Sequence, residues 1–145
     1  MENQPVTLSE ETHWEKAART RMGKYLTHLE TSFILDSFNP SKTQMVIDVG
    51  AEAGRFSLMS TNNNASMIAI DIDSYSLRRL KQKNKDVVVI QADARKIPMK
   101  NATFDAVFMI EVLDYIPELT EALSECSRIL RPSSPLILSF GNNLA

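Results

Sequence analysis

The stretch MVIDVGAEAGRF, residues 45–56, decides the fold class because it joins a short apolar run to a loop that contains two glycines. The run MVI lacks the polar and apolar alternation of a half-exposed strand, which is typical of a strand covered on both faces in a parallel sheet. Gly50 permits a tight turn with positive φ, and Gly54 lets the following helix pack closely on the strand. The stretch therefore predicts a strand, a ligand-binding loop and a helix in succession.

Four further apolar runs repeat this pattern along the chain. We predict strands at residues 67–70, 87–90, 106–110 and 136–138, and helices at 54–60, 74–84 and 118–130. Strand and helix alternating at this interval indicate right-handed crossovers between parallel strands. The sequence thus predicts an α/β fold with a Rossmann-like, doubly wound, mostly parallel sheet of about five strands.

Residues 6–37 predict an N-terminal helical segment ahead of this sheet. Thr7 and Glu10 have the spacing of a capping box, and Asn39-Pro40 ends the pattern. Gly23 lies inside the pattern, so we expect a break into two helices there. The apolar stripe of the segment recurs at about 3.6 residues and consists of Trp14, Ala18, Tyr25, Leu29 and Phe33.

Length and net charge limit the class of protein to which the chain can belong. The 145 residues fit one domain, which we divide into the helical segment 1–40 and a core at 41–145. A net charge of −2 disfavours nucleic acid or an anionic membrane as the main partner. The acidic, polar N-terminus and the lack of an apolar run of about 20 residues lead us to expect a cytoplasmic protein.

Two other features have simple structural interpretations. The single cysteine, Cys126, cannot form a disulfide framework or a structural zinc site, and we predict that it is a core residue and that the chain has no metal site. Five basic residues between positions 78 and 85 are expected to form a solvated outer face of one helix: Arg78, Arg79, Lys81, Lys83 and Lys85.

An acidic residue stands at or just after the end of each of the first four predicted strands. Ligands of open α/β sheets bind beyond the carboxyl ends of the strands, so these positions are where function is sought. The acids Asp48, Asp71, Asp93 and Glu111 are 23, 22 and 18 residues apart, which is the interval of one strand–helix unit. One such acid is as often a helix cap or turn former, but four at matching positions predict a common rim.

Glu52 adds a fifth carboxylate in the middle of the glycine-containing loop. A dinucleotide-binding loop has a third glycine there, and a carboxylate would repel the pyrophosphate, so a nicotinamide dehydrogenase is disfavoured. The acidic rim instead suits a nucleoside attached to a positively charged group. Asp71, 21 residues after Gly50, is placed to accept both ribose hydroxyls, and Asp93 to accept from an adenine amino group.

In order and spacing, residues 44–141 resemble the core of the class I S-adenosylmethionine-dependent methyltransferases, of the type 11-like small-molecule kind, without the C-terminal part of that domain. Residues 46–50 with 54–57 resemble the first motif of the family, and 69–73 its ribose-binding segment. Residues 91–94 with 97–99 resemble the adenine-side loop of the family, and residues 104–107 its fourth strand. Residues 111–116 resemble the segment after that strand, and residues 129–132 the turn before strand five.

The resemblance implies S-adenosylmethionine as cofactor and residues 1–40 as a lid over it. Gly50, Ala51 and Gly54 would face its methionine part, Asp71 and Ile72 the ribose, and Asp93 and Ala94 the adenine. The rim residues Asp48, Glu52 and Glu111 complete the expected cofactor site.

Methyl transfer requires alignment of the reactants rather than a catalytic triad, although an acceptor proton can need a general base. Our candidates for that base are Glu111, Asp114 and Tyr115, just after the fourth predicted strand. His13 or His28 of the lid is an alternative. Trp14 and Tyr25 are expected to anchor the helices, or else to contact the cofactor or the acceptor.

Two functions from different classes follow. The first is a methyltransferase acting on an unidentified small-molecule acceptor, which the retained Asp71 and Asp93 favour. The alternative is a methyltransferase-like, non-catalytic binding module that acts through a partner chain, which Glu52 and the short distance from the fifth strand to residue 145 favour. That strand would be an exposed sheet edge, so we also expect a homo-oligomer or a partner chain to cover it.

Overall fold

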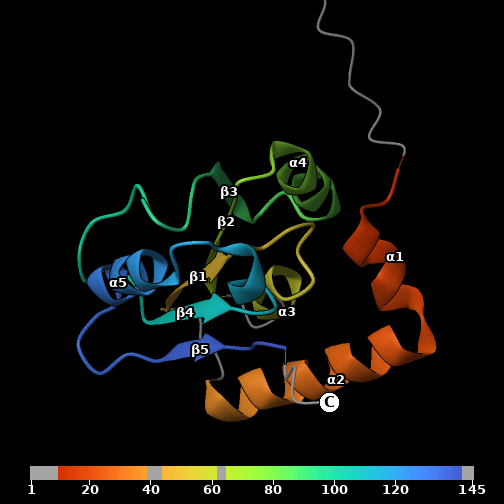
Figure 1. Ribbon diagram of the computed structural model, residues 1–145, viewed down its shortest axis with the longest axis horizontal. Coiled ribbons are helices and arrows are strands. Elements are labelled where there is room, and N and C mark those ends of the chain that lie inside the picture. The colour runs from red at the N-terminus through yellow and green to blue at the C-terminus, as the bar shows by residue number, and fades with distance from the viewer. Residues whose placement is uncertain (1–9, 39–43, 62–64, 142–145) are drawn as a thin grey trace, which may run out of the picture.

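A computed structural model describes residues 10–38, 44–61 and 65–141 (Figure 1). Five parallel strands form one sheet in the order β3-β2-β1-β4-β5. The strands are β1 (Met45–Val49), β2 (Ser66–Asp71), β3 (Val88–Gln91), β4 (Ala106–Met109) and β5 (Leu136–Leu138). The prediction of a Rossmann-like, parallel sheet of about five strands is confirmed.

The register brings the carboxyl ends of the central strands to one edge of the sheet. Val49 of β1 pairs with Ile70 of β2, and Asp71, the last residue of β2, pairs with Gln91, the last residue of β3. β1 lies between β2 and β4, and its Val46, Ile47 and Val49 are fully buried. The loop that follows β1 therefore begins at the middle of this edge.

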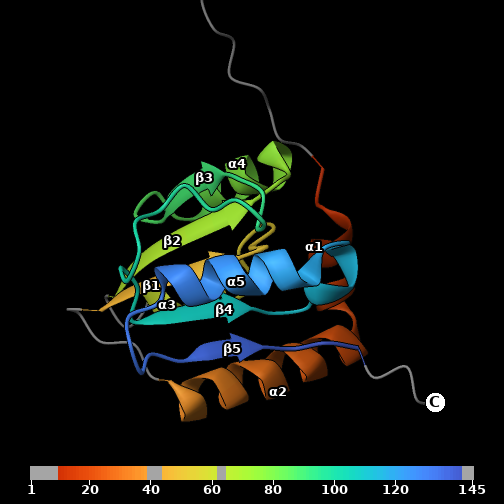
Figure 2. The ribbon, with the colours of Figure 1, turned by 60° about the vertical axis from the view of Figure 1, so that its left-hand side comes forward.

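Helices cover both faces of the sheet (Figures 1 and 2). One core layer joins the sheet to α2 (Arg21–Ser37) through Ile34, to α3 (Ser57–Thr61), and to α4 (Ser74–Lys83) through Leu80. The other joins it to the 3₁₀ turn η1 (Leu113–Tyr115) and to α5 (Leu119–Ile129), whose Cys126 is a core residue as predicted. No helix of the described residues is long and apolar enough to cross a membrane.

The N-terminal segment is two helices that meet at Thr20. Thr20 caps the C-terminus of α1 (His13–Arg19) and the N-terminus of α2, where its hydroxyl accepts from the Gly23 amide at 3.0 Å. The break expected at Gly23 is thus three residues earlier. A Cβ on Gly23 would lie 2.1 Å from the Ala17 carbonyl oxygen, so glycine here permits the close approach of α1.

Two expectations about this segment are corrected. Residues 10–12 are not helical, and α1 begins at His13 with a capping box formed by Thr12 and Glu15. The capping box expected at Thr7 lies outside the described residues. The apolar stripe of α2 faces away from the sheet, because Tyr25 and Phe33 are 57% and 58% exposed while Ile34 is buried. Tyr25 therefore does not anchor the helix. The boundary expected between residues 40 and 41 also lies outside the described residues.

Candidate functional site

Two adjoining cavities open at the carboxyl edge of the sheet. The first, of about 430 Å³, lies between α1 and the loop after β1, and its lining includes Gly50–Phe56, Arg79 and Lys83. The second, of about 530 Å³, lies beyond β2 and β3 and includes Asp71 and Asp93. Four residues line both cavities and mark their junction: Trp14, Gly50, Glu52 and Glu111.

The loop after β1 has the turn that its glycines predict. Gly50 and Gly54 have φ of +77° and +88°, and the amides of Gly50 and Ala51 both donate to the Ile70 carbonyl, at 2.9 and 3.0 Å. A Cβ on Gly50 would lie 2.3 Å from the Val112 side chain, so glycine is needed for space as well as for conformation. Glu52 adopts φ of +50°, a left-handed conformation that glycine would adopt with less strain.

Asp71 links this loop to the end of β2. Its Oδ2 accepts from the Glu52 amide and its Oδ1 from the Asp73 amide, both at 2.8 Å. Each carboxylate oxygen has two lone pairs, so both can still accept a hydroxyl from a ligand. Asp71 therefore shapes the loop and lines the second cavity with the same carboxylate.

Asp48 lies beneath the loop and lines neither cavity. Its side chain is buried, and its Oδ2 accepts from the Ser57 hydroxyl at 2.5 Å. Burial raises the pKa of Asp48 to about 6, although the hydrogen bond from Ser57 opposes the shift. Asp48 is thus the one acid of the predicted rim that the structure separates from the other four.

Asp93 lines the second cavity with a partner that the sequence analysis did not identify. Arg95 donates to Asp93 Oδ2 at 2.6 Å and also pairs with Glu118. The guanidinium hydrogen bonds lower the pKa of Asp93 to about 2. Ile72 and Ala94 line the same cavity.

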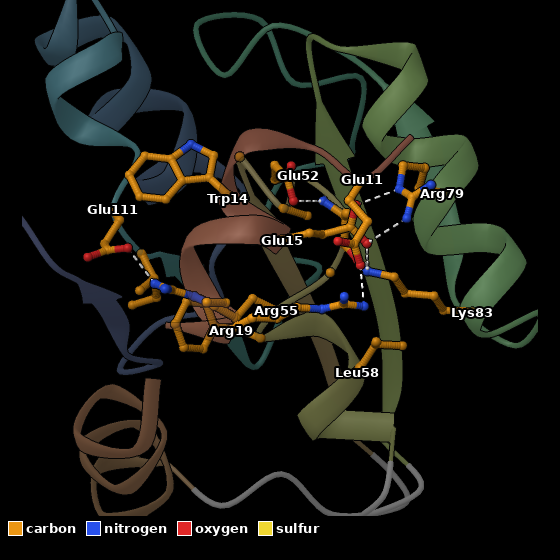
Figure 3. Close-up of a pocket in the computed structure, with 17 residues that line it drawn as sticks. Glu11, Trp14, Glu15, Arg19, Glu52, Arg55, Leu58, Arg79, Lys83 and Glu111 are labelled. Carbon is orange, nitrogen blue, oxygen red and sulfur yellow. Dashed lines mark hydrogen bonds and ion pairs between the residues drawn. The ribbon is translucent and has the colours of Figure 1, made fainter. Parts of the chain in front are cut away.

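Arg55 connects the junction of the cavities to α2. It donates to Glu30 at 2.9 Å. It also binds the Glu111 carboxylate, as Figure 3 shows. Glu111 has φ of +54°, and its amide donates to the Ser139 hydroxyl at 2.9 Å. Burial raises the pKa of Glu30, and the Arg55 charge opposes this shift. The Arg55 network therefore holds Glu111 at the junction.

A second ionic cluster fastens α1 over the first cavity. Glu15 accepts from Arg79 Nε and Lys83 Nζ, both at 2.5 Å, and both donors belong to α4 (Figure 3). Burial opposes ionisation of Glu15, but these donors and the Thr12 amide prevail and lower its pKa to about 2. The basic run is therefore only partly the solvated face that was expected, because Arg79 and Lys83 hold the N-terminal helix.

The candidates for the general base separate by position. Glu111 and Tyr115 line the second cavity, whereas Asp114 is exposed and lines neither. His13 lines the second cavity, and His28 is exposed and lines neither. The ring of Trp14 meets that of Tyr115 edge-on, with centroids 6.3 Å apart. Among the described residues, no group of three or more His, Cys, Asp or Glu could hold a metal ion.

Comparison with known proteins adds an independent observation. A family model described as "Methyltransferase domain" matches residues 47–138. An O-methyltransferase of Pyrenophora dematioidea is 27% identical over an alignment 135 residues long, which covers 88% of this chain and 51% of that protein. The chain spans about half the length of the curated relatives it matches.

Two solved structures share the fold. The PH0226 protein of Pyrococcus horikoshii has a TM-score of 0.77 at 22% identity, over 92% of this chain and 64% of that one. The phosphoethanolamine N-methyltransferase 1 of Haemonchus contortus, solved with phosphoethanolamine and S-adenosylhomocysteine, has a TM-score of 0.72 at 21% identity. That match covers 86% of this chain and 30% of the other.

Proposed function

Because the chain belongs to the methyltransferase domain family, we propose that it binds S-adenosylmethionine and transfers its methyl group to a small-molecule acceptor. The observation that carries this proposal is the junction of the two cavities. Its lining combines an aromatic ring, two carboxylates and a glycine, from Trp14, Glu52, Glu111 and Gly50. Aromatic faces and carboxylates attract cations. S-adenosylmethionine carries its positive sulfonium charge between its adenosine end and its amino-acid end.

The remaining lining fits the two ends of this cofactor. In our proposal Asp71 and Ile72 hold the ribose, and Asp93 and Ala94 the adenine, in the second cavity. The amino-acid end lies in the first cavity, next to the backbone of Gly50, Ala51 and Gly54 and the carboxylate of Glu52. Asp48 would support the loop from below rather than contact the cofactor, because it lines neither cavity.

The chemistry asks little more of the protein than alignment and exclusion of water. The cofactor supplies a methyl group that its sulfonium charge already activates. The ionic attachment of Glu15 to Arg79 and Lys83 holds α1 across the first cavity, and Trp14 of that helix covers the junction. Glu111 and Tyr115 are supported as candidates for the general base by their position, and Asp114 is not.

The non-catalytic binding module is the second candidate. Glu52 favours it, because its carboxylate lines the first cavity and already accepts from the neighbouring Ala53 amide of its own loop. The two adjoining cavities and the family favour the enzyme instead. The two functions predict different results in a cofactor titration.

The chain contains one tryptophan, so fluorescence reports directly on the junction. We expect saturable quenching of Trp14 by S-adenosylmethionine. Calorimetry should show that Trp14→Leu weakens this binding by roughly two- to thirtyfold, the range of a cation–π contact, and weakens neutral S-adenosylhomocysteine less. The control is Phe140→Leu, an exposed aromatic outside both cavities. No binding of either ligand at millimolar concentration would favour the non-catalytic module.

Glu52→Gln tests whether the loop carboxylate serves the cofactor. The change removes one negative charge at the junction, so S-adenosylmethionine should bind roughly three- to tenfold more weakly. The binding of S-adenosylhomocysteine, whose sulfur is uncharged, should weaken less. The matched control is Glu121→Gln, the same charge change on an exposed position of α5. Tighter binding by Glu52→Gln in calorimetry would mean that Glu52 obstructs the cofactor, as the non-catalytic alternative requires.

A further inference from the structure

The outer face of α2 carries a stripe of large apolar side chains that nothing in the described chain covers. Met22, Tyr25, Leu26, Leu29 and Phe33 are 64%, 57%, 40%, 46% and 58% exposed. At 100° per residue they lie on one side of the helix, centred about 120° around the helix axis from the buried Ile34. They are five of the nine large hydrophobic side chains that are exposed among the described residues. A contiguous patch of this kind marks an interaction surface.

Four of the five side chains in this outer stripe of α2 lie at positions that are symmetric about the middle of the stripe. Met22 and Phe33 lie equally far from the point between Thr27 and His28, and Leu26 and Leu29 also lie equally far from it. Two copies of α2 packed antiparallel about a two-fold axis through this point would bring Met22 against Phe33 and Leu26 against Leu29. Such self-complementarity is what a two-fold interface between identical chains requires.

Charges beside the stripe select the antiparallel arrangement. Arg21 begins α2 and Asp36 lies near its end, and both are exposed. At 100° per residue both project to the side of the stripe that carries Tyr25. The antiparallel pair would place Arg21 of each copy about 3 Å along the axis from Asp36 of the other, since they are offset by two residues. A parallel pair would place each Arg21 level with the other Arg21 and each Asp36 level with the other Asp36, so no opposite charges would be paired.

From these observations we infer that α2 is the docking surface for a second copy of this chain, in an antiparallel, two-fold helix pair. The surface adjoins the side of the sheet that ends with β5, because α2 lies along β5 in both views (Figures 1 and 2). It also adjoins the candidate site, because Glu30 of α2 binds Arg55 and α2 continues from α1 through Thr20. The inference rests on the outer stripe and its charges, and not on the proposed cofactor.

Sedimentation velocity of the full chain, from low to high micromolar concentration, tests the interface. We expect a concentration-dependent dimer that Leu26→Glu converts to a monomer. Val88→Glu places the same charge on an exposed apolar position of β3, at the opposite edge of the sheet, and should leave the dimer unchanged. Circular dichroism checks that each variant is folded. A wild-type monomer throughout, or equal effects of the two substitutions, overturns the inference.

A charge exchange tests the orientation. Arg21→Asp and Asp36→Arg should each weaken dimerisation by roughly three- to tenfold, because each sets like charges against one another across the antiparallel pair. The double variant restores opposite charges and should dimerise like the wild type. A double variant that dimerises as weakly as either single variant contradicts the antiparallel pair. A wild-type chain that stays monomeric and instead binds neutral lipid vesicles through the stripe contradicts it as well.

Discussion

Replacing Asp71 by alanine is expected to weaken S-adenosylmethionine binding by roughly 10- to 150-fold, equivalent to about 1.5–3 kcal/mol for hydrogen bonds to a charged group. The carboxylate is our proposed acceptor for the ribose hydroxyls. It also holds the Glu52 and Asp73 amides, so its removal loosens the loop that forms the junction of the cavities. Isothermal titration calorimetry measures the loss.

Two further variants make this result specific. Asp71→Asn keeps one acceptor oxygen and should bind with intermediate affinity. Asp114→Ala removes a carboxylate that is exposed and lines neither cavity, so its affinity should equal that of the wild type. If Asp71→Ala folds normally by circular dichroism and binds the cofactor unchanged, Asp71 does not belong to the site.

Asp48→Asn is expected to stabilise the protein at pH 7 by up to about 3 kcal/mol. The folded pKa of Asp48 is raised from 3.8 to about 6, and each unit of pKa corresponds to about 1.4 kcal/mol. A raised pKa means that the folded state prefers the protonated acid. The stability that Asp48 contributes is therefore complete below pH 4 and is lost as the pH rises through 6. Asparagine carries no charge at any pH and keeps an oxygen that can accept from Ser57.

The measurement is the difference in unfolding free energy between wild type and variant, from urea denaturation at pH 4 to 7. The difference isolates Asp48, because the acids with lowered pKa values, Glu15 and Asp93 among them, occur in both proteins. Those acids act in the opposite direction, losing their contribution as the pH falls from their ordinary values toward 2. Asp114→Asn controls for the charge change on an exposed side chain. A difference that does not change with pH refutes the raised pKa.

The sequence could predict the sheet because each strand contains a short continuous apolar run that is visible in the local sequence. The apolar runs end where acids or glycines begin, and the positions of Asp71 and Asp93 follow from the parallel topology alone. Four of the five acids of the predicted rim line the second cavity for this reason. Asp48 does not, because it lies one residue before the end of β1 and its side chain is buried, whereas Asp71 is the last residue of β2.

The contacts that the sequence could not predict join residues far apart in the chain. Arg55 binds partners 25 and 56 positions away, and Arg79 binds Glu15 across 64 positions. No local pattern marks such pairs, although the Thr12 and Glu15 spacing could have indicated where α1 begins. The direction of the apolar stripe on α2 was equally hidden, because periodicity identifies an apolar face but not what lies opposite it.

The order of the strands has a consequence for how the protein is made on the ribosome. β2 pairs with β1, β3 with β2, β4 with β1 and β5 with β4. Each strand that leaves the exit tunnel therefore finds its neighbour already synthesised, and the nascent sheet can grow outward from its first strand without waiting for later sequence.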